Sequence, residues 1–510
     1  MSRPRHRAVA RDASAANLPT IQRDPDLLQS FLSDAAHVPG GTAEGVVFPR
    51  NVDELAAVVR VAKRLLPVGA QSSLTGGATP RGDLVISTRA LSELTEADGE
   101  TVRAGAGVPL SELQRFLSTR DLYYPPVPTF DGAFIGGTIA TNAAGAATFK
   151  YGVTRDWVVG LTVVLADGSI LDIRRGDVRA SDAGVIEIDT GKSTPISITI
   201  PTYEVPKLPK VSAGYFTEPH LDLVDLFVGS EGTLGVIASV TLRVKRRPLR
   251  CVALVTCASE AQAFAVTTRL RAEAAAVAPL DVAAIEYVDS RSLALVDDST
   301  FAAAGIPPPN DHETVLLAQI ETEGNLDGAL ARLDEVLQAA SVADDPVIAL
   351  PEDERTAARL FELREAVPAA VNARVAAAKA RAGDAIQKMA GDFIVPFDAL
   401  PAALAHYRDA FERRELDYAI WGHISDGNLH PNVIPRSPRD IEQGRDALRE
   451  MARGVIAFGG APLAEHGVGR NPLKQQFLRD MYGDRGIEQM RAVKRALDPE
   501  GKLASGVLFS

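Results

Sequence analysis

A run of small residues from Gly136 to Gly145 constrains most strongly how this chain can fold. It reads Gly-Gly-Thr-Ile-Ala-Thr-Asn-Ala-Ala-Gly, and a backbone with so little side-chain bulk suits close contact with a large flat ligand and its phosphates. The run lacks the G-x-G-x-x-G spacing of a Rossmann turn, and no Gly-Lys-Ser/Thr follows it as in a P-loop. The run therefore indicates a ligand-binding loop that is neither a Rossmann turn nor a P-loop.

A second loop of similar composition runs from Leu66 to Ala78, ahead of a predicted strand at residues 83–87. Successive backbone N–H groups in such a loop can form a concave site for an anion. A plain turn has the same glycine and serine content, so this loop by itself does not establish a binding site.

Size and charge limit the classes of function. The chain has 510 residues, more than one hydrophobic core normally covers, which predicts two or three domains. The formal net charge of -12 argues against nucleic acid as the main partner. The first twenty residues carry four arginines but no apolar stretch, and we expect a flexible arm rather than a signal peptide.

Cysteine content bears on the compartment. The two cysteines, Cys251 and Cys257, provide neither a disulfide framework nor an iron–sulfur ligand set. No apolar run is long enough to span a bilayer. We expect a cytoplasmic protein, with peripheral attachment to a membrane left open as an option.

Two short motifs near the C-terminus hold the side chains best suited to bind a metal or transfer a proton. His423 and His430 flank Asp426-Gly427, a strong turn dipeptide that predicts a hairpin with the two imidazoles side by side. Glu465 and His466 follow a short apolar run. Two imidazoles and a carboxylate are the usual protein ligands of an open catalytic metal site, which leaves His466 for proton transfer. Two hydrogen-bonded core histidines are the alternative interpretation.

Residues 40–247 resemble the FAD-binding domain of the vanillyl-alcohol oxidase/PCMH flavoprotein superfamily. Four blocks carry the resemblance, namely 67–77, 135–145, 150–152 and 229–235. The resemblance implies FAD as the cofactor, and dissociable FAD because the loop at 66–78 has neither histidine nor cysteine. It implies these cofactor-binding residues: Gly69, Gln71, Ser72, Ser73, Leu74, Thr75, Pro128, Gly136, Gly137, Thr141, Asn142, Gly145, Tyr151, Glu231, Gly232, Val236 and Ile237.

The remainder resembles the C-terminal domain of FAD-linked D-2-hydroxyacid dehydrogenases, a group that includes D-lactate dehydrogenase, D-2-hydroxyglutarate dehydrogenase and the glycolate oxidase flavin subunit. The Gly-His-x-x-Asp-Gly-Asn-x-His motif of that group is Gly422–His430 here, and Glu-His-Gly-x-Gly is Glu465–Gly469. The resemblance implies a zinc or manganese ion on His423, His430 and Glu465, with His466 as the base.

The same resemblance implies three substrate contacts. Asn432 follows the second histidine by two residues, and Arg364 lies in a Leu-Arg-Glu segment. Lys388 precedes an Asp-x-x-x-Pro strand, although its spacing to Asp392 is not the usual one. Each has a plain alternative: Arg364 as a surface helix residue, Lys388 as a solvated lysine and Asn432 as a turn residue.

These observations predict an α+β fold. We expect a two-part FAD-binding domain of the PCMH type, an α+β cap domain with split βαβ (ferredoxin-like) repeats, and a C-terminal helix that returns to the FAD domain. The expected boundaries are an arm at 1–20, the FAD domain at 21–247, the cap at 248–460 and a closing segment at 461–510. An insertion at 176–208 has no assigned counterpart, although a hairpin is expected around Thr190-Gly191.

The expected function is oxidation of a small D-2-hydroxy acid to the 2-keto acid by hydride transfer to flavin N5. The reduced flavin then needs an acceptor, which we expect to be a quinone, a cytochrome or an electron-transfer flavoprotein. Two alternatives remain: a flavin-binding subunit of a glycolate-oxidase-like complex, and an enzyme similar to alkylglycerone-phosphate synthase. The sequence leaves the oligomeric state open, with a homodimer as one option.

Overall fold

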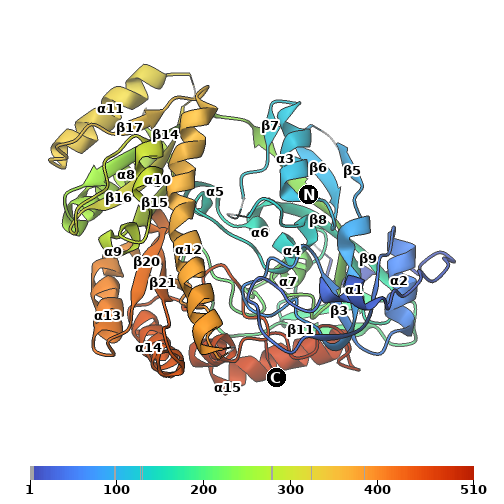
Figure 1. The fold of residues 1–510 in the computed structure, drawn as a ribbon. Coiled ribbons are helices and arrows are strands. Elements are labelled where there is room, and N and C mark those ends of the chain that lie inside the picture. The colour runs from blue at the N-terminus through green and yellow to red at the C-terminus, as the bar shows by residue number, and fades with distance from the viewer. Residues whose placement is uncertain are drawn as a thin grey trace. The chain divides into compact units, whose positions relative to one another are not determined.

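The computed structural model describes residues 5–96, 99–126, 128, 130–276, 280–322, 324–383 and 385–509. The chain forms two compact units (Figure 1). Unit 1 comprises 1–145, 152–246 and 463–510, and unit 2 comprises 146–151 and 247–462. A search of the described helices finds none long and apolar enough to cross a membrane.

Unit 1 contains a three-stranded parallel sheet in the order β2-β4-β3. Its strands are β2 (Thr42–Val47), β3 (Leu65–Val68) and β4 (Arg81–Ser87). Helix α2 (Val52–Val61) joins the first two, and the side chain of Asn51 caps its N-terminus by accepting from the Glu54 N–H. The small-residue loop at 69–80 therefore leaves the carboxyl end of β3 and returns into β4.

A five-stranded antiparallel sheet forms the second part of unit 1, in the order β5-β6-β12-β8-β9. Its strands are β5 (Leu94–Glu96), β6 (Thr101–Gly105), β8 (Val158–Val164), β9 (Ile170–Arg174) and β12 (Val236–Arg243). The short helices of this unit are α1 (Pro25–Gln29), α3 (Leu110–Ser118), α4 (Ile135–Ala140), α6 (Thr154–Trp157) and α7 (Leu223–Phe227). A two-stranded pair, β7 (Leu122–Tyr123) and β13 (Lys245–Arg246), completes it.

The N-terminal segment differs from the expected flexible arm. Strand β1 (Arg7–Val9) pairs in parallel with β10 (Val185–Asp189), which pairs in turn with β11 (Ile196–Thr199). Arg7 also forms an ion pair with Asp189. The expectation was wrong for these residues because their pairing partner lies far along the chain, inside the unassigned insertion. The hairpin expected in that insertion is confirmed.

The C-terminal segment belongs to unit 1. Helix α15 (Pro472–Leu497) begins at Asn471, whose side chain caps it, and it kinks at Gly483. Beyond it the chain joins the parallel sheet, because the Leu65 N–H donates to Lys502 O at 2.8 Å and the Ala504 N–H donates to Leu65 O at 2.7 Å.

Unit 2 is built on one antiparallel sheet in the order β17-β14-β16-β15-β20-β21-β18, with β19 also paired to β21. The strands are β14 (Leu249–Cys257), β15 (Asp281–Val288), β16 (Thr314–Thr322), β17 (Val347–Ala349), β18 (Met389–Ala390), β19 (Phe393–Ile394), β20 (Tyr418–His423) and β21 (Asn428–Val433). The short strands β18 and β19 are separated by Gly391 and Asp392.

Helices cover this sheet. They are α5 (Thr148–Tyr151), α8 (Glu260–Ala276), α9 (Ser290–Leu293), α10 (Asp298–Ala304), α11 (Leu326–Ala339), α12 (Glu354–Ala382), α13 (Leu400–Glu412) and α14 (Pro438–Ala457). The long helix α12 presents a stripe of apolar residues at helical spacing, Leu360, Leu363, Val367 and Val371. This stripe packs in one buried cluster with sheet residues that include Leu254, Leu317 and Trp421. The face of the sheet that α12 covers is also the face that carries the hairpin histidines.

Candidate active site

The tight return between β20 and β21 brings His423 and His430 close together, as the turn dipeptide predicts. A short 3-10 turn (Ile424–Asp426) ends at Gly427, which has φ 83°. In the hairpin register Trp421 is opposite His430 and His423 is opposite Asn428, so both histidines project from the same face. Their ring centroids lie 5.5 Å apart at an interplanar angle of 89°, and both side chains are buried.

Glu286 contacts His423, although the sequence analysis assigns this glutamate no role. It lies on β15 directly opposite His423 in the register of β15 and β20. Its Oε1 is 2.9 Å from His423 Nδ1, and its Oε2 is 3.3 Å from Nη2 of Arg364. A glutamate within the apolar run Val282–Val288 is the signal that sequence reasoning missed, since a buried charge needs a partner.

Arg364 lies on α12 and is buried, which excludes the interpretation as a surface residue. Besides Glu286 it contacts Glu365, whose Oε1 accepts from Nη1 at 2.8 Å. The guanidinium is therefore held between two carboxylates on the helix-covered face of the unit 2 sheet.

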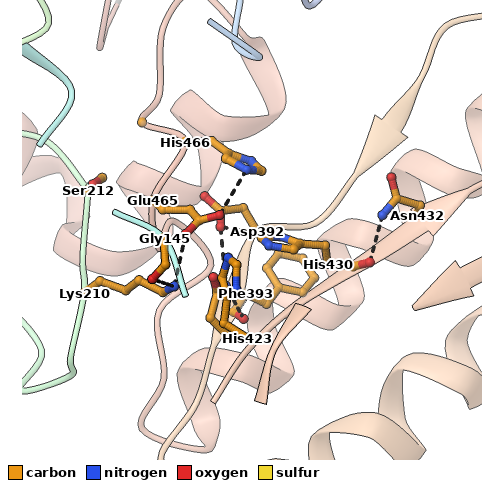
Figure 2. Close-up of polar contacts among 12 residues, drawn as sticks. Gly145, Lys210, Ser212, Asp392, Phe393, His423, His430, Asn432, Glu465 and His466 are labelled. Atoms are coloured by element: carbon orange, nitrogen blue, oxygen red, sulfur yellow. Dashed lines mark hydrogen bonds and ion pairs between the residues drawn. The ribbon is translucent and has the colours of Figure 1, made fainter. Parts of the chain in front are cut away.

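Asp392 and Asn432 lie around His430 (Figure 2). A carboxylate oxygen of Asp392 is 3.9 Å from His430 Nδ1, and the side chain is buried. The Asn432 amide donates to the carbonyl oxygen of His430 at 2.8 Å. Its own Oδ1 is buried without a hydrogen-bond partner among the described residues, which is the environment expected of an atom that awaits a ligand.

Lys388 lies between α12 and β18, and much of its side chain is exposed. Partial burial lowers the pKa of its ammonium group from the ordinary lysine value. Among the described residues no hydrogen bond joins Lys388 to the hairpin cluster, so the structure adds no contact that supports its predicted role.

Unit 1 holds Glu465 and His466 in the loop that precedes α15 (Figure 2). Glu465 Oε2 accepts from Nζ of Lys210 at 3.0 Å, and Glu465 Oε1 lies 3.4 Å from His466 Nε2. The Lys210 side chain is fully buried, and its Nζ is 3.5 Å from the carbonyl oxygen of Gly145. Lys210 is a second residue without a role in the sequence prediction, and it joins the small-residue run to the Glu-His motif.

Glu231 holds the backbone that follows His466. Its two carboxylate oxygens accept from the N–H groups of Val468 and Gly469, each at 2.8 Å. A β-carbon on Gly469 would lie 2.2 Å from Thr75 Oγ1, so only glycine fits there. Burial raises the pKa of Glu231 to about 7, against the lowering effect of the two N–H donors.

Three of the predicted cofactor blocks lie together in unit 1. A β-carbon on Gly69 would contact Phe134 and Gly137, and the N–H of Gly229 donates to Ile139 O at 3.0 Å. Gly232 packs against Pro67. Gln71, Asn142 and Glu231 all have positive φ without being glycine, a strained conformation that concentrates at ligand sites.

The other predicted cofactor residues have varied environments. Ser73 and Thr75 share a hydrogen bond of 2.9 Å in the loop at 69–80, where Leu74 is exposed. The Thr141 hydroxyl donates to Gly137 O. Val236 and Ile237 begin β12 and pair with β8. Gly136, Gly145 and Ser72 lie in the small-residue loops, and Pro128 is half-buried.

Tyr151 is the exception, since it belongs to unit 2. Its hydroxyl group donates to Glu321 on β16, which also accepts from Lys150 at 2.6 Å and Arg250 at 2.6 Å. Burial raises the pKa of Glu321. The positive charge of Arg250 and the hydrogen bonds from Lys150, Tyr151 and Arg250 outweigh this effect, so the pKa lies below its ordinary value. The structure therefore assigns the Tyr151 hydroxyl to this contact.

The residues present fit the cofactors that the sequence implies. For FAD, the glycines of the two loops leave bare backbone: a β-carbon at Gly137 would meet nothing within 4 Å. For a divalent cation, the unit 2 hairpin offers two imidazoles beside a carboxylate, and the unit 1 loop offers the pair Glu465 and His466. Imidazole and carboxylate together are the donor set of zinc and manganese sites.

Comparison with known protein families gives two matches. Residues 247–508 match the C-terminal domain of FAD linked oxidases, and residues 43–174 match an FAD binding domain.

Similar curated proteins cover nearly the whole chain. The glycolate oxidase subunit GlcD of Bacillus subtilis is 29% identical over 92% of this chain and 89% of its own. A D-2-hydroxyglutarate dehydrogenase of Stutzerimonas stutzeri is 27% identical over 96% of each chain. A probable mitochondrial D-lactate dehydrogenase of Danio rerio is 27% identical over 90% of this chain and 83% of its own.

Solved structures support the fold. A 4-ethylphenol oxidase from Gulosibacter chungangensis aligns with a TM-score of 0.65 at 16% identity, over 96% of this chain and 94% of the other. An alkyldihydroxyacetonephosphate synthase aligns with a TM-score of 0.56 at 15% identity, over 90% of this chain and 75% of the other. At such identities the likeness concerns the fold alone.

Proposed function

The chain belongs to the family of FAD-linked oxidases and is an oxidoreductase with an FAD-binding domain, and we propose that it oxidises a D-2-hydroxy acid to the 2-keto acid. The observation that carries the proposal is the buried polar cluster on the β20–β21 hairpin. Two buried imidazoles with ring centroids 5.5 Å apart lie near the amide oxygen of Asn432, which has no hydrogen-bond partner among the described residues, and such a polar cluster suits a ligand. The relatives named for hydroxy acids support the choice of substrate class.

The proposed ligands of the divalent cation are His423, His430 and Glu465, and the cation is zinc or manganese. When bound, the cation supplies charge that lowers the pKa of a substrate hydroxyl, and non-covalently bound FAD supplies the two-electron acceptor. Asp392 is a further carboxylate beside His430, and in this proposal it orients that ring.

Three residues act on the substrate itself. His466 takes the hydroxyl proton, because imidazole is the side chain whose ordinary pKa suits proton transfer near neutral pH. Arg364 binds the substrate carboxylate, for which a planar guanidinium is well shaped. Asn432 donates or accepts a hydrogen bond through its amide. Lys388 remains a proposed substrate contact of the same group.

Anaerobic flavin reduction tests the proposal. The purified holoprotein is mixed with a panel of D-2-hydroxy acids, and bleaching of the flavin band is expected with at least one of them. Stripping the metal with a chelator is expected to abolish bleaching, and zinc or manganese to restore it. His466→Ala should keep FAD bound but slow bleaching by about 100-fold or more. A yellow protein that no D-2-hydroxy acid bleaches would contradict the proposal.

A second candidate is a flavin-binding subunit of a larger electron-transfer complex. The glycolate oxidase subunit among the relatives favours it. Under this proposal a quinone, a cytochrome or an electron-transfer flavoprotein accepts the electrons, and the isolated chain would bind FAD without turning over hydroxy acids.

Cys251 and Cys257 are free thiols buried in β14, which suits a reducing compartment such as the cytoplasm.

A further inference from the structure

We propose that Glu286 is a positioning residue that sets the orientation of both His423 and Arg364. The inference rests on the proposed function, in which His423 is a metal ligand and Arg364 binds the substrate carboxylate. One buried carboxylate would then govern metal binding and substrate binding together.

The sheet register brings the three residues together. Glu286 on β15 is paired with His423 on β20, so both side chains leave the sheet on one face, and α12 brings Arg364 onto that face. Each carboxylate oxygen has its own partner: Oε1 is 2.9 Å from His423 Nδ1 and Oε2 is 3.3 Å from Arg364 Nη2. The exposed fractions of Glu286, His423 and Arg364 are only 6%, 1% and 8%.

The contact with the Glu286 carboxylate determines the tautomer of His423. An ionised carboxylate only accepts hydrogen bonds, so Nδ1 of His423 carries the proton and donates it to Glu286. In the neutral ring the lone pair is then on Nε2, and a cation would bind through that nitrogen. A carboxylate on the distal nitrogen also makes the ring a better donor to the metal, and loss of such a partner typically weakens metal binding by about 10- to 100-fold.

Arg364 compensates the negative charge of the Glu286 carboxylate in a buried site. An isolated buried carboxylate is costly, whereas an adjacent guanidinium offsets its charge and holds it by a charge-assisted contact. The same contact fixes the guanidinium. Its orientation is set before any substrate arrives, which lowers the entropy cost of binding a second carboxylate.

The test is Glu286→Gln in the full chain with FAD bound. The amide keeps the shape but can serve only one of the two partners as an acceptor. Titration with zinc alone, in competition with a chromophoric chelator, is expected to show affinity reduced tenfold or more. At saturating zinc, the residual defect should be a raised KM for the hydroxy acid, with the flavin spectrum unchanged.

Glu260→Gln is the matched control. Glu260 lies in the same unit and pairs with an arginine, Arg408, while it accepts a hydrogen bond from Tyr287 on β15. Among the described residues its polar side-chain contacts go to Arg408 and Tyr287 and not to the hairpin histidines, so zinc affinity should equal that of the wild type. If Glu286→Gln does not fold, Glu286→Asp keeps the charge but retracts it by one methylene, and the same loss of zinc affinity is expected.

The outcomes separate this inference from the proposed function. If the wild type binds zinc and hydroxy acids bleach its flavin, but Glu286→Gln and Glu286→Asp keep both zinc affinity and KM, only the role of Glu286 is overturned. If zinc binds and weakens in the variants while no hydroxy acid bleaches the wild type, the orientation of His423 stands and the proposed reaction fails. A wild type that binds neither zinc nor manganese overturns both.

Discussion

Buried carboxylates define the chemistry of this protein at the scale of single residues. Glu286 pairs with His423 and Arg364, Glu465 pairs with Lys210, and Glu231 binds two backbone N–H groups. Removal of a carboxylate from water makes its charged form unfavourable unless such partners compensate it. The partners therefore fix the geometry of the side chains and loops to which the proposed function assigns roles.

Glu231 predicts a pH dependence of stability. Its pKa in the folded protein is raised to about 7 from an ordinary value of 4.5. Between these values the unfolded chain has released the proton while the folded chain retains it, so folding stability falls as pH rises through this window. The free energy of unfolding of the wild type, measured relative to Glu231→Gln by urea titration, should decrease from pH 4.5 to 7. A difference that stays constant or increases would contradict the raised pKa.

The β20–β21 hairpin is the element on which the site depends. Its turn ends at Gly427 with φ 83° and ψ 13°, the left-handed conformation that glycine adopts without strain. A β-carbon there would lie 2.2 Å from the carbonyl oxygen of Val395. The turn is thus packed against the strand region that carries Asp392, and any shift of it also moves the two histidines.

Gly427→Ala should therefore lower the free energy of unfolding by more than the left-handed conformation alone explains. Left-handed strain costs about 1–2 kcal/mol, and the clash with Val395 adds to it. Gly305→Ala is the matched control, because Gly305 has nearly the same conformation, with φ 84° and ψ 18°. A β-carbon there would lie 3.9 Å from its nearest neighbour, a methyl carbon of Val347. Chemical denaturation should show a larger loss of unfolding free energy for Gly427→Ala than for Gly305→Ala. Zinc titration should show weaker binding in the Gly427→Ala variant alone. Equal losses would mean that the contact with Val395 relaxes freely.

At the scale of the whole molecule, the chain contributes to its two units in alternation. Unit 1 takes three separate segments, and its last segment begins at Leu463, two residues before Glu465. That segment is tied to the parallel sheet, since Lys502 Nζ donates to Val59 O at 2.8 Å and Ala504 bonds to Leu65. Strand β3 leads directly into the loop at 69–80, which holds several of the predicted cofactor residues, so the segment at 463–509 packs behind that predicted loop.

Deletion of residues 499–510 should therefore weaken FAD binding. It removes the backbone bonds from Lys502 and Ala504 to Leu65 and exposes the edge of β3. After gel filtration the truncated protein should retain less flavin, measured by its visible absorbance, than the full chain. Glu500→Ala is the control, because Glu500 is exposed and should leave flavin content unchanged. Full retention of flavin by the truncated chain would contradict a supporting role.

Local sequence determined the parts of this protein whose partners lie nearby in the chain. Asp426-Gly427 predicts the hairpin that carries His423 and His430, because the turn depends on residues a few positions apart. Only the tertiary structure identified Glu286 and Lys210, which lie 137 and 255 residues from their partners His423 and Glu465. It also gave the N-terminal segment its strand. Such pairings follow from sheet register and burial, which bring together residues that no short pattern connects.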